Sequence, residues 1–394
     1  MGDTTRTTCD LAIVGAGPAG AAAALGALAV APGLSVLLLD RHDFPRDKAC
    51  GDGIAPQVLD LLAEVGLTGL LDDWKPVGRF TLRRHALEVD RELARANWVV
   101  PRAVFDHRLV LAARAAGARL VRHRVRSVDV RSDHVGLDGT LAAEVVVGAD
   151  GAHSVVRAAL GVRPNPVALA LRGYAPTPEA LAGRQMIVFG AARQPAYAWS
   201  FDRGDGLSNV GYGELLSPHR PRPSRAGLRA KLEELIPGSA ERGTAWRAHH
   251  LPLSTWRWRP HDGRILLTGD AAALINPMTG EGIYYAVATG LLAGRAAALA
   301  IGSRCPGDAG ARYRRTVGPL LSRHLRHLAL ASRLCRFGHV LDTGIRAATA
   351  SRQIFDDLVE LGLANGTISP ELARAIALGS RWVGTSGPGA RGQR

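Results

Sequence analysis

The chain has 394 residues, 47% hydrophobic and 21% charged, which suits a soluble globular enzyme of two to three domains. Its net charge of +14 comes almost entirely from arginine, and no nucleic-acid recognition motif or lysine-rich block accompanies it. Four dispersed cysteines form no CxxC pair, which argues against a disulfide framework or a zinc site. The charge therefore indicates attraction to an anionic membrane surface or an acidic substrate, or has no function.

The apolar stretch from residue 11 to 39 carries no formal charge and has the length of a membrane span. Glycine and proline interrupt it at Gly15, Gly17, Gly20, Pro32 and Gly33, which predicts a strand, a turn, a helix and a second strand instead. The residues before it lack the layout of a signal peptide. We therefore expect a cytoplasmic protein.

The same stretch predicts a dinucleotide-binding βαβ unit. The strand Leu11 to Val14 leads into Gly15-Ala16-Gly17-Pro18-Ala19-Gly20, a G-x-G-x-x-G turn that opens an alanine-rich helix. The glycines allow a tight turn, the approach of a pyrophosphate and close packing of helix on strand. Asp40 ends the second strand twenty residues later, where a carboxylate can bind a ribose.

The pattern alone is weak evidence, because residues 387 to 392 match it too. That second match follows no adequate strand and opens no helix, and we expect residues 384 to 394 to be a disordered tail.

Two further segments place small residues after a strand. Residues 145 to 157 contain a buried strand followed by Asp150 and a helix start. Residues 264 to 300 contain a strand ending at Asp270, then Pro277, then Gly280-Glu281-Gly282 at the start of a long helix. Asp270 is suited to bonding a chain of hydroxyls, and the helix N–H groups are suited to a ring that becomes anionic on reduction.

In this order and spacing, the three segments resemble the FAD-binding set of the group A flavoprotein monooxygenase superfamily, over about residues 9 to 300. The resemblance implies FAD as cofactor. Arg102, just before a helix with Asp106, would contact the flavin chain, or else form an ordinary ion pair. The implied cofactor-binding residues are Gly15, Gly17, Ala19, Gly20, Asp40, Arg41, Cys50, Gly51, Arg102, Asp150, Gly269, Asp270, Pro277, Gly280, Gly282 and Ile283.

Two other segments resemble the geranylgeranyl reductase family, a branch of that superfamily. They are "FPRDKACGDGI" at residues 44 to 54 and "YAWSF" at residues 197 to 201, where the family usually continues with proline but this chain has Asp202. Alternation puts Tyr197, Trp199 and Phe201 on one face of a strand, either a pocket for a prenyl chain or an ordinary core face. Cys50 would lie near the flavin, as a proton donor or as a packing residue.

The expected fold is α/β, with a Rossmann-like FAD-binding domain, an inserted antiparallel-sheet substrate domain and a helical C-terminal region. The FAD domain would comprise residues 1–163 and 262–308, the substrate domain 164–261 with a contribution from 79–99, and the helical region 309–383. Strand-like runs occur at 184–190, 196–202 and 207–214. The basic amphipathic stretch 312–337 would touch a membrane or pack on the FAD domain. His324 and His327 share a helix face without further ligands, so we expect no metal.

The sequence therefore predicts an FAD-dependent oxidoreductase that reduces a C=C bond of an isoprenoid or prenylated, apolar small molecule. The alternative is an FAD monooxygenase or oxidase acting on an aromatic or polyketide-like metabolite, and a third interpretation is a flavin-binding sensor. No second nicotinamide-binding fold is evident, so NAD(P)H would bind transiently or a separate reductase would supply electrons.

Overall fold

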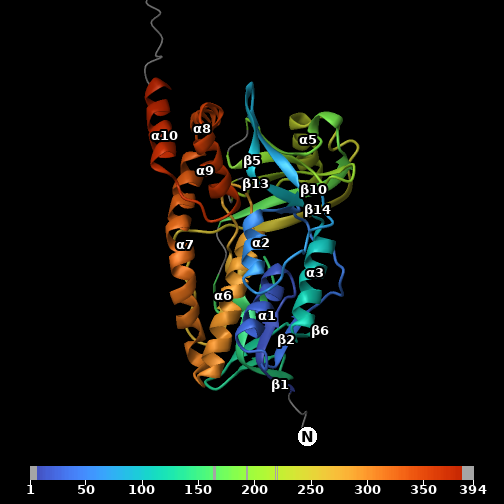
Figure 1. The fold of residues 1–394 in the computed structure, drawn as a ribbon, viewed down its shortest axis with the longest axis vertical. Coiled ribbons are helices and arrows are strands. Elements are labelled where there is room, and N and C mark those ends of the chain that lie inside the picture. The colour runs from blue at the N-terminus through green and yellow to red at the C-terminus, as the bar shows by residue number, and fades with distance from the viewer. Residues whose placement is uncertain (1–6, 163–165, 192–193, 218, 220, 384–394) are drawn as a thin grey trace, which may run out of the picture.

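A computed structural model of the chain describes residues 7–162, 166–191, 194–217, 219 and 221–383. The expected tail, with its second glycine pattern, and the expected boundary residues 164 and 165 lie outside this range. Figure 1 shows two β-sheets stacked along the long axis of the molecule, with helices α7 to α10 along one side.

The first sheet has seven strands in the order β6-β2-β1-β9-β8-β7, with β15 paired to β9. Five of its strands are parallel: β6 (Arg119–Arg122), β2 (Val36–Asp40), β1 (Thr7–Val14), β9 (Leu141–Gly148) and β15 (Ile265–Leu267). Val14, Leu39, Gly148 and Leu267 are in register, so the turns that follow these strands share one edge. Ligands of such sheets bind at this edge. The antiparallel strands β7 (Val128–Val130) and β8 (Val135–Leu137) complete the sheet.

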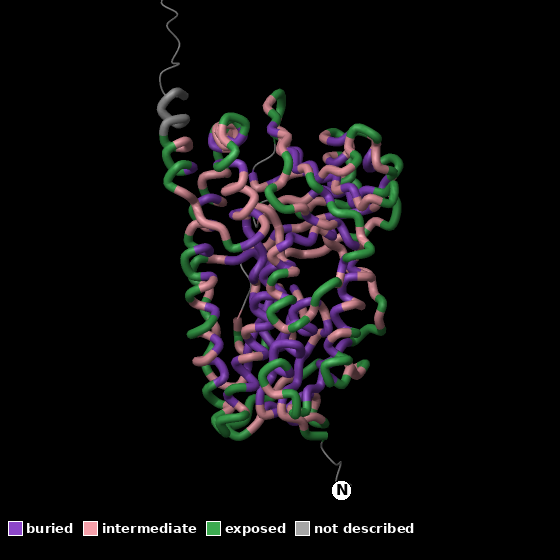
Figure 2. The backbone as a smooth tube through the Cα atoms, viewed as in Figure 1, coloured by how far each residue is buried: buried purple, intermediate pink, exposed green. Residues whose placement is uncertain are grey.

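Two small-residue helices cover this sheet. α1 (Pro18–Val30) and α6 (Ile283–Gly302) cross so closely that a Cβ at Gly290 or Gly294 would overlap backbone oxygens of α1. α6 is the one helix among the described residues that is long and apolar enough to span a membrane, and 78% of its 18-residue apolar window is buried inside the protein. The predicted strand-helix-strand unit is confirmed by β1, α1 and β2, and Figure 2 shows how deeply it is buried.

The second sheet has eight strands in the order β14-β10-β13-β12-β11-β4-β5-β3. Their bounds are β14 (Thr244–Pro252), β10 (Val167–Pro176), β13 (Leu207–Leu215), β12 (Ala196–Asp202), β11 (Arg184–Phe189), β4 (Val77–Arg84), β5 (Leu87–Val99) and β3 (Gly53–Ile54). The three strand-like runs in the sequence correspond to β11, β12 and β13. The sheet is not fully antiparallel as expected, because β4 and β11, which are far apart in the chain, pair in parallel.

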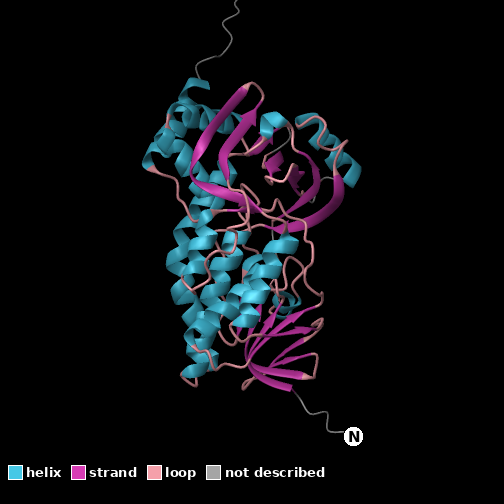
Figure 3. Cartoon of the chain, turned by 45° about the vertical axis from the view of Figure 1, so that its right-hand side comes forward, coloured by secondary structure: helices cyan, strands magenta, loops and turns pink. Residues whose placement is uncertain are grey.

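The two faces of this second sheet have different covers (Figure 3). α5 (Arg225–Leu235) packs on one face through Leu228 and Leu232. The opposite face carries Trp199 and Ile187 and contacts α8 (Gly338–Ala350) and α9 (Arg352–Leu363). The remaining helices are α2 (Pro56–Ala63), α3 (Arg102–Ala115), α4 (Val155–Ala159), α7 (Ala309–Leu334) and α10 (Pro370–Val383), with short 3-10 turns η1 (Glu179–Leu181), η2 (Gly269–Ala272) and η3 (Pro306–Asp308).

The basic amphipathic stretch is α7, and its apolar face is part of the main core through Tyr313, Val317 and Leu325. His324 lies at the same interface, bonded to the Tyr285 hydroxyl at 2.6 Å and to the Gly366 carbonyl at 2.5 Å. His327 accepts the Ile368 N–H at 2.9 Å. No group of three His, Cys, Asp or Glu residues in the described ranges could hold a metal ion.

Candidate cofactor and substrate site

One cavity of about 820 Å³ runs from the carboxyl edge of the parallel sheet to the face of the second sheet that α8 and α9 cover. All the residues predicted from the sequence to bind cofactor or substrate line this cavity, except Gly20 and Gly269. At the edge end the lining is polar and glycine-rich, and toward the C-terminal helices it becomes apolar. The fold thus brings together segments separated by more than 250 residues.

The turn between β1 and α1 leaves space and free donors at the polar end. Gly15 has φ +100°, and a Cβ there would overlap the Ala149 carbonyl, so this position requires glycine. A Cβ at Gly17 would meet only the Nη2 of Arg46, at 3.3 Å. No side chain caps the N-terminus of α1, so its first N–H groups are available to an anion.

Asp40 is held firmly at the end of β2. Its two carboxylate oxygens accept the N–H groups of Ala16 and His42, both at 2.9 Å, and the side chain is nearly buried. A carboxylate has about four acceptor positions, so these two bonds leave capacity for ribose hydroxyls. Arg41 also lines this end and bonds His42.

Arg46 was not predicted as a site residue: it lies in the loop segment FPRDKACGDGI but matches no named pattern. Its guanidinium lies 3.8 Å from Asp40 and 3.5 Å from Asp106, and its Nε is buried without a partner. An unpartnered buried donor beside the open space at Gly17 fits a diphosphate. The donor set at this end therefore fits the diphosphate and ribose of FAD, and Arg46 joins the candidate cofactor residues.

The middle of the site is crossed by the loop from Phe44 to Gly53. Lys48 bonds Asp270 at 2.8 Å, and this charge lowers the pKa of Asp270 against the opposing effect of burial. Asp47 binds Arg172 and Arg247 of the second sheet. The charged residues of this loop thus connect the carboxyl edge of the first sheet to the second sheet.

Cys50 lies in the same loop and lines the cavity beside Arg102. Burial raises the pKa of its thiol, and the nearby Arg102 charge only partly opposes this effect. The thiol therefore stays protonated at neutral pH. Arg102 is itself nearly buried and forms a bidentate ion pair with Asp106, at 2.6 and 2.9 Å. The ion pair at the start of α3, which was one of the two alternatives for Arg102, is therefore present, and Arg102 also lines the cavity.

Asp52, which the sequence did not single out, anchors this loop to β10 and β13, and through Asn209 to Trp199 of β12. Its side chain is fully buried, its φ is +60°, and its Oδ2 accepts bonds from Tyr174 (2.6 Å) and Asn209 (2.8 Å). Asn209 also donates to the Cys50 carbonyl and accepts the indole N–H of Trp199, both at 2.8 Å. Burial raises the pKa of Asp52 to about 6. The segment "DGLSNVG" contains Asn209, but no local pattern shows that it meets Asp52.

Tyr197, Trp199 and Phe201 lie on the same face of β12 and line the cavity. Neighbouring ring centroids are 6.0 and 6.4 Å apart. A Cβ at Gly51 would come within 3.3 Å of Phe201, so the loop packs closely against this face. The Tyr197 hydroxyl donates to the Thr279 carbonyl, which ties the aromatic strand to the turn before α6.

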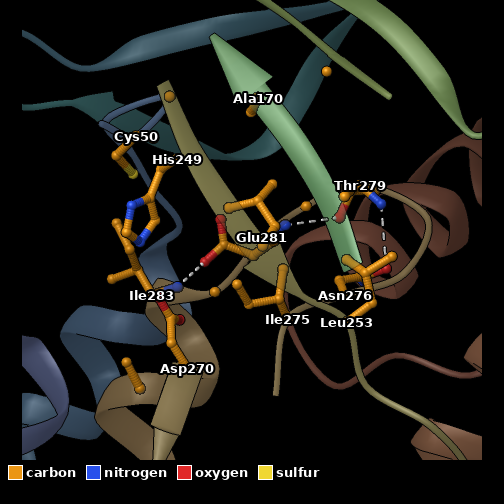
Figure 4. Close-up of a pocket in the computed structure, with 18 of the residues that line it drawn as sticks. Cys50, Ala170, His249, Leu253, Asp270, Ile275, Asn276, Thr279, Glu281 and Ile283 are labelled. Atoms are coloured by element: carbon orange, nitrogen blue, oxygen red, sulfur yellow. Dashed lines mark hydrogen bonds between the residues drawn. The ribbon is translucent and has the colours of Figure 1, made fainter. Parts of the chain in front are cut away.

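At the start of α6 the structure differs from the expectation of free N–H groups. The Glu281 Oε1 accepts the N–H of Ile283 at 2.6 Å (Figure 4) and that of Tyr284 at 2.9 Å. The Gly280 N–H donates to the Asn276 carbonyl. The positive end of a helix attracts a carboxylate, and Glu281 is the residue that can reach it. Asp150 behaves similarly: it bonds Ser154 and Val155 and so caps α4.

The fold and this site define an FAD-dependent oxidoreductase. Residues 8–169 match the model of an FAD-binding domain family. The chain is 33% identical to a menaquinone reductase of Mycolicibacterium smegmatis over 73% of this chain and 76% of that protein. It is 32% identical to a digeranylgeranylglycerophospholipid reductase of Methanopyrus kandleri over 74% of this chain and 81% of that protein.

Among solved structures, a geranylgeranyl bacteriochlorophyll reductase-like protein from Thermoplasma acidophilum superposes with a TM-score of 0.73 at 21% identity. The match covers 94% of this chain and 96% of that one, which establishes a shared fold. The chain belongs to the geranylgeranyl reductase family of FAD-dependent oxidoreductases.

Proposed function

We propose that the protein reduces a C=C bond in the prenyl chain of an apolar substrate. The observation that carries this proposal is the apolar extension of the cavity, which continues from Trp199 between the second sheet and the C-terminal helices. Both relatives named above are reductases of molecules that carry prenyl chains. The lining of this extension includes Phe80, Ile187, Phe189, Val340, Ile345 and Leu358.

The residues of this chain would bind and orient both partners in the reaction. Bound FAD, once reduced, supplies a hydride equivalent. Gly15 to Gly20, Arg46 and Asp40 would hold its diphosphate and adenosine, with Asp270 and Arg102 nearer the ring. Tyr197, Trp199 and Phe201 would set the position of the prenyl chain, and the apolar walls would exclude water. We assign Cys50 to contact with the ring and packing, since its side chain is partly buried and lines the cavity.

The domain division remains part of this proposal. The seven-stranded sheet with α1, α3 and α6 would form the FAD-binding domain, and the eight-stranded sheet with α5 the substrate domain. Electrons would come from NAD(P)H bound transiently or from a separate reductase, because the chain shows one dinucleotide turn of the required kind within the described ranges.

A peripheral membrane contact would suit a substrate of this kind. The apolar face of α7 is used by the core, but Leu330 and Phe337 are about half exposed beside cavity-lining Leu334 and Cys335. We propose this surface as the contact. Phe337→Asp should then reduce co-sedimentation with anionic lipid vesicles, whereas Trp256→Asp, at an equally exposed aromatic residue outside the C-terminal helices, should not. If Phe337→Asp and Trp256→Asp bind the vesicles equally, this surface is not the membrane contact.

The monooxygenase alternative rested on the short substrate domain and on Asp202, which replaces the usual proline. In the structure Asp202 accepts bonds from the N–H of Gly183 (2.6 Å), the N–H of Gly204 (3.0 Å) and the hydroxyl of Thr177 (3.1 Å). It does not line the cavity. Its position is explained by local structure at the end of β12, so no observation favours the alternative over the reductase.

The decisive experiment is anaerobic. Reduced, FAD-loaded protein is mixed with a menaquinone bearing an unsaturated prenyl chain, and with the same quinone bearing a saturated chain. We expect flavin oxidation and a product heavier by two hydrogens with the unsaturated chain only, after correction for reduction of the quinone ring. Flavin oxidation that is equal with the two quinones, without saturation of the prenyl chain, would refute the reductase proposal. In a separate sample exposed to air with ligand present, a stable oxygen adduct of the flavin would refute it as well.

A further inference from the structure

Glu281 is a carboxyl group in the cavity that the mechanism above does not use. It belongs to the turn between Asn276 and α6, and Figure 4 shows its carboxyl group within the cavity. Oε1 accepts both helix N–H groups, whereas Oε2 accepts no hydrogen bond from any described residue. One oxygen is thus fixed by the helix, and the other is free to carry a proton.

The surroundings of Glu281 contain little compensating positive charge. Arg102 of α3 is the cation that lowers the pKa of Glu281, and its guanidinium is already paired with Asp106. Burial is the largest effect and raises the pKa of Glu281 to about 7, against the opposing helix N–H groups and Arg102. The other titratable groups facing it are Asp270 of η2, Cys50 of the loop after β2, Tyr197 of β12, His249 of β14 and Tyr285 of α6.

These neighbours do not compete with Glu281 as proton carriers near neutral pH. Burial lowers the pKa of His249 to about 4, so its imidazole is neutral, and burial raises the pKa values of Cys50, Tyr197 and Tyr285. Lys48 keeps Asp270 ionised. Glu281 is therefore the group in this part of the cavity whose protonation responds to a nearby change in charge.

We propose that Glu281 is the proton store of the site: it gains a proton when the bound FAD receives two electrons, and later protonates the substrate. The reason is electrostatic, since negative charge added to the ring stabilises the neutral form of an adjacent carboxyl. The second half of the proposal rests on the proposed alkene reduction. The C=C π bond breaks, a hydride from the reduced cofactor forms one C–H bond, and the Glu281 proton forms the other. Glu281 would thereby return to its carboxylate, and the hydride would carry the two electrons from the reduced cofactor.

The first half can be tested without any substrate. Each proton taken up with two electrons changes a midpoint potential by about 30 mV per pH unit. Potentiometric titration of the FAD-loaded protein with dithionite between pH 8 and 9, where Glu281 starts as its carboxylate, should give about 59 mV per pH unit, for one proton on the flavin and one on Glu281. Glu281→Gln should give about 30 mV per pH unit. The amide oxygen of glutamine still accepts the helix N–H groups, so the variant removes titration and keeps the cap.

The matched control is Glu360→Gln. Glu360 is half-buried with a pKa raised by burial, but it does not line the cavity, so this variant should keep the wild-type slope. A wild-type slope of about 30 mV per pH unit, or equal slopes for wild type and Glu281→Gln, would overturn the proposal. If Glu281→Gln fails to fold, infrared difference spectra of the wild type decide: a protonated carboxyl band must appear on reduction.

The second half needs a prenyl probe. In single turnover with a menaquinone of unsaturated chain, Glu281→Gln should slow saturation of the chain by about 100-fold or more, with unchanged reduction by dithionite. Unchanged saturation would refute the role of Glu281 as donor. If wild type does not saturate this probe or geranylgeranyl diphosphate, the proposed function fails, while the substrate-free proton count still decides whether Glu281 stores a proton.

Discussion

Replacing Asp52 by asparagine should make the stability of the protein less dependent on pH. Asp52 is fully buried, and its pKa of about 6 lies above the ordinary 3.8. The folded protein therefore holds this proton more tightly than the unfolded chain does. Stability from this group is complete below pH 3.8 and is lost as the pH rises through about 6. At about 1.36 kcal/mol per pKa unit, the total loss is about 3 kcal/mol, of which about 1.4 kcal/mol falls between pH 5 and 8.

The assay is urea unfolding of FAD-loaded wild type and Asp52→Asn, followed by tryptophan fluorescence, at several pH values from 5 to 8. The Oδ1 of Asp52 has no partner, so the asparagine NH2 placed there adds a cost of about 1–3 kcal/mol that does not depend on pH. The informative quantity is therefore the change with pH of the difference between the two proteins. We expect the variant to gain about 1.4 kcal/mol relative to wild type from pH 5 to 8.

Asp60→Asn is the control. Asp60 is exposed, and its hydrogen bond with Arg95 lowers its pKa, so it is ionised in both folded and unfolded states above pH 5. The difference between this variant and wild type should stay constant from pH 5 to 8. A constant difference for Asp52→Asn as well would show that Asp52 is not a buried acid with a raised pKa.

Three further predictions concern the site. Gly17→Val should fold but lose FAD, because a Cβ there meets only the flexible end of Arg46. Gly20→Ala should instead lower the thermal stability of the protein, because a Cβ there overlaps the Gly15 backbone. A folded Gly17→Val protein with full FAD absorbance would refute the assignment of this turn to FAD. Trp199→Ala should keep its FAD but lose about 1–3 kcal/mol in substrate binding or positioning, and parallel loss of flavin would make Trp199 structural. Thiol labelling with mass mapping should find Cys50 protected until FAD is removed, with exposed Cys305 as the reference; identical protection in both states would contradict contact with the cofactor.

Much of the FAD-binding half could be predicted because its signals are local. The turn after β1 needs glycine at Gly15 for its φ of +100°, and a helix must follow within a few residues. The strand runs in the second sheet were also recognisable from alternation, which places Tyr197 and Trp199 on one face whatever covers it. The parallel pair of β4 and β11 was not predictable, since no local feature specifies which distant strand completes a sheet edge.

By itself, the sequence determined the βαβ unit, the order of the cofactor segments and the family, because each depends on residue types at short, fixed spacings. Only the tertiary structure decided what Arg46, Asp52 and Glu281 do. Arg46 acquires its significance from Gly17 and Asp106, and Asp52 from Asn209, 157 residues away. Burial and long-range hydrogen bonds set the charge state of such groups, and these are properties of the assembled fold that no segment contains.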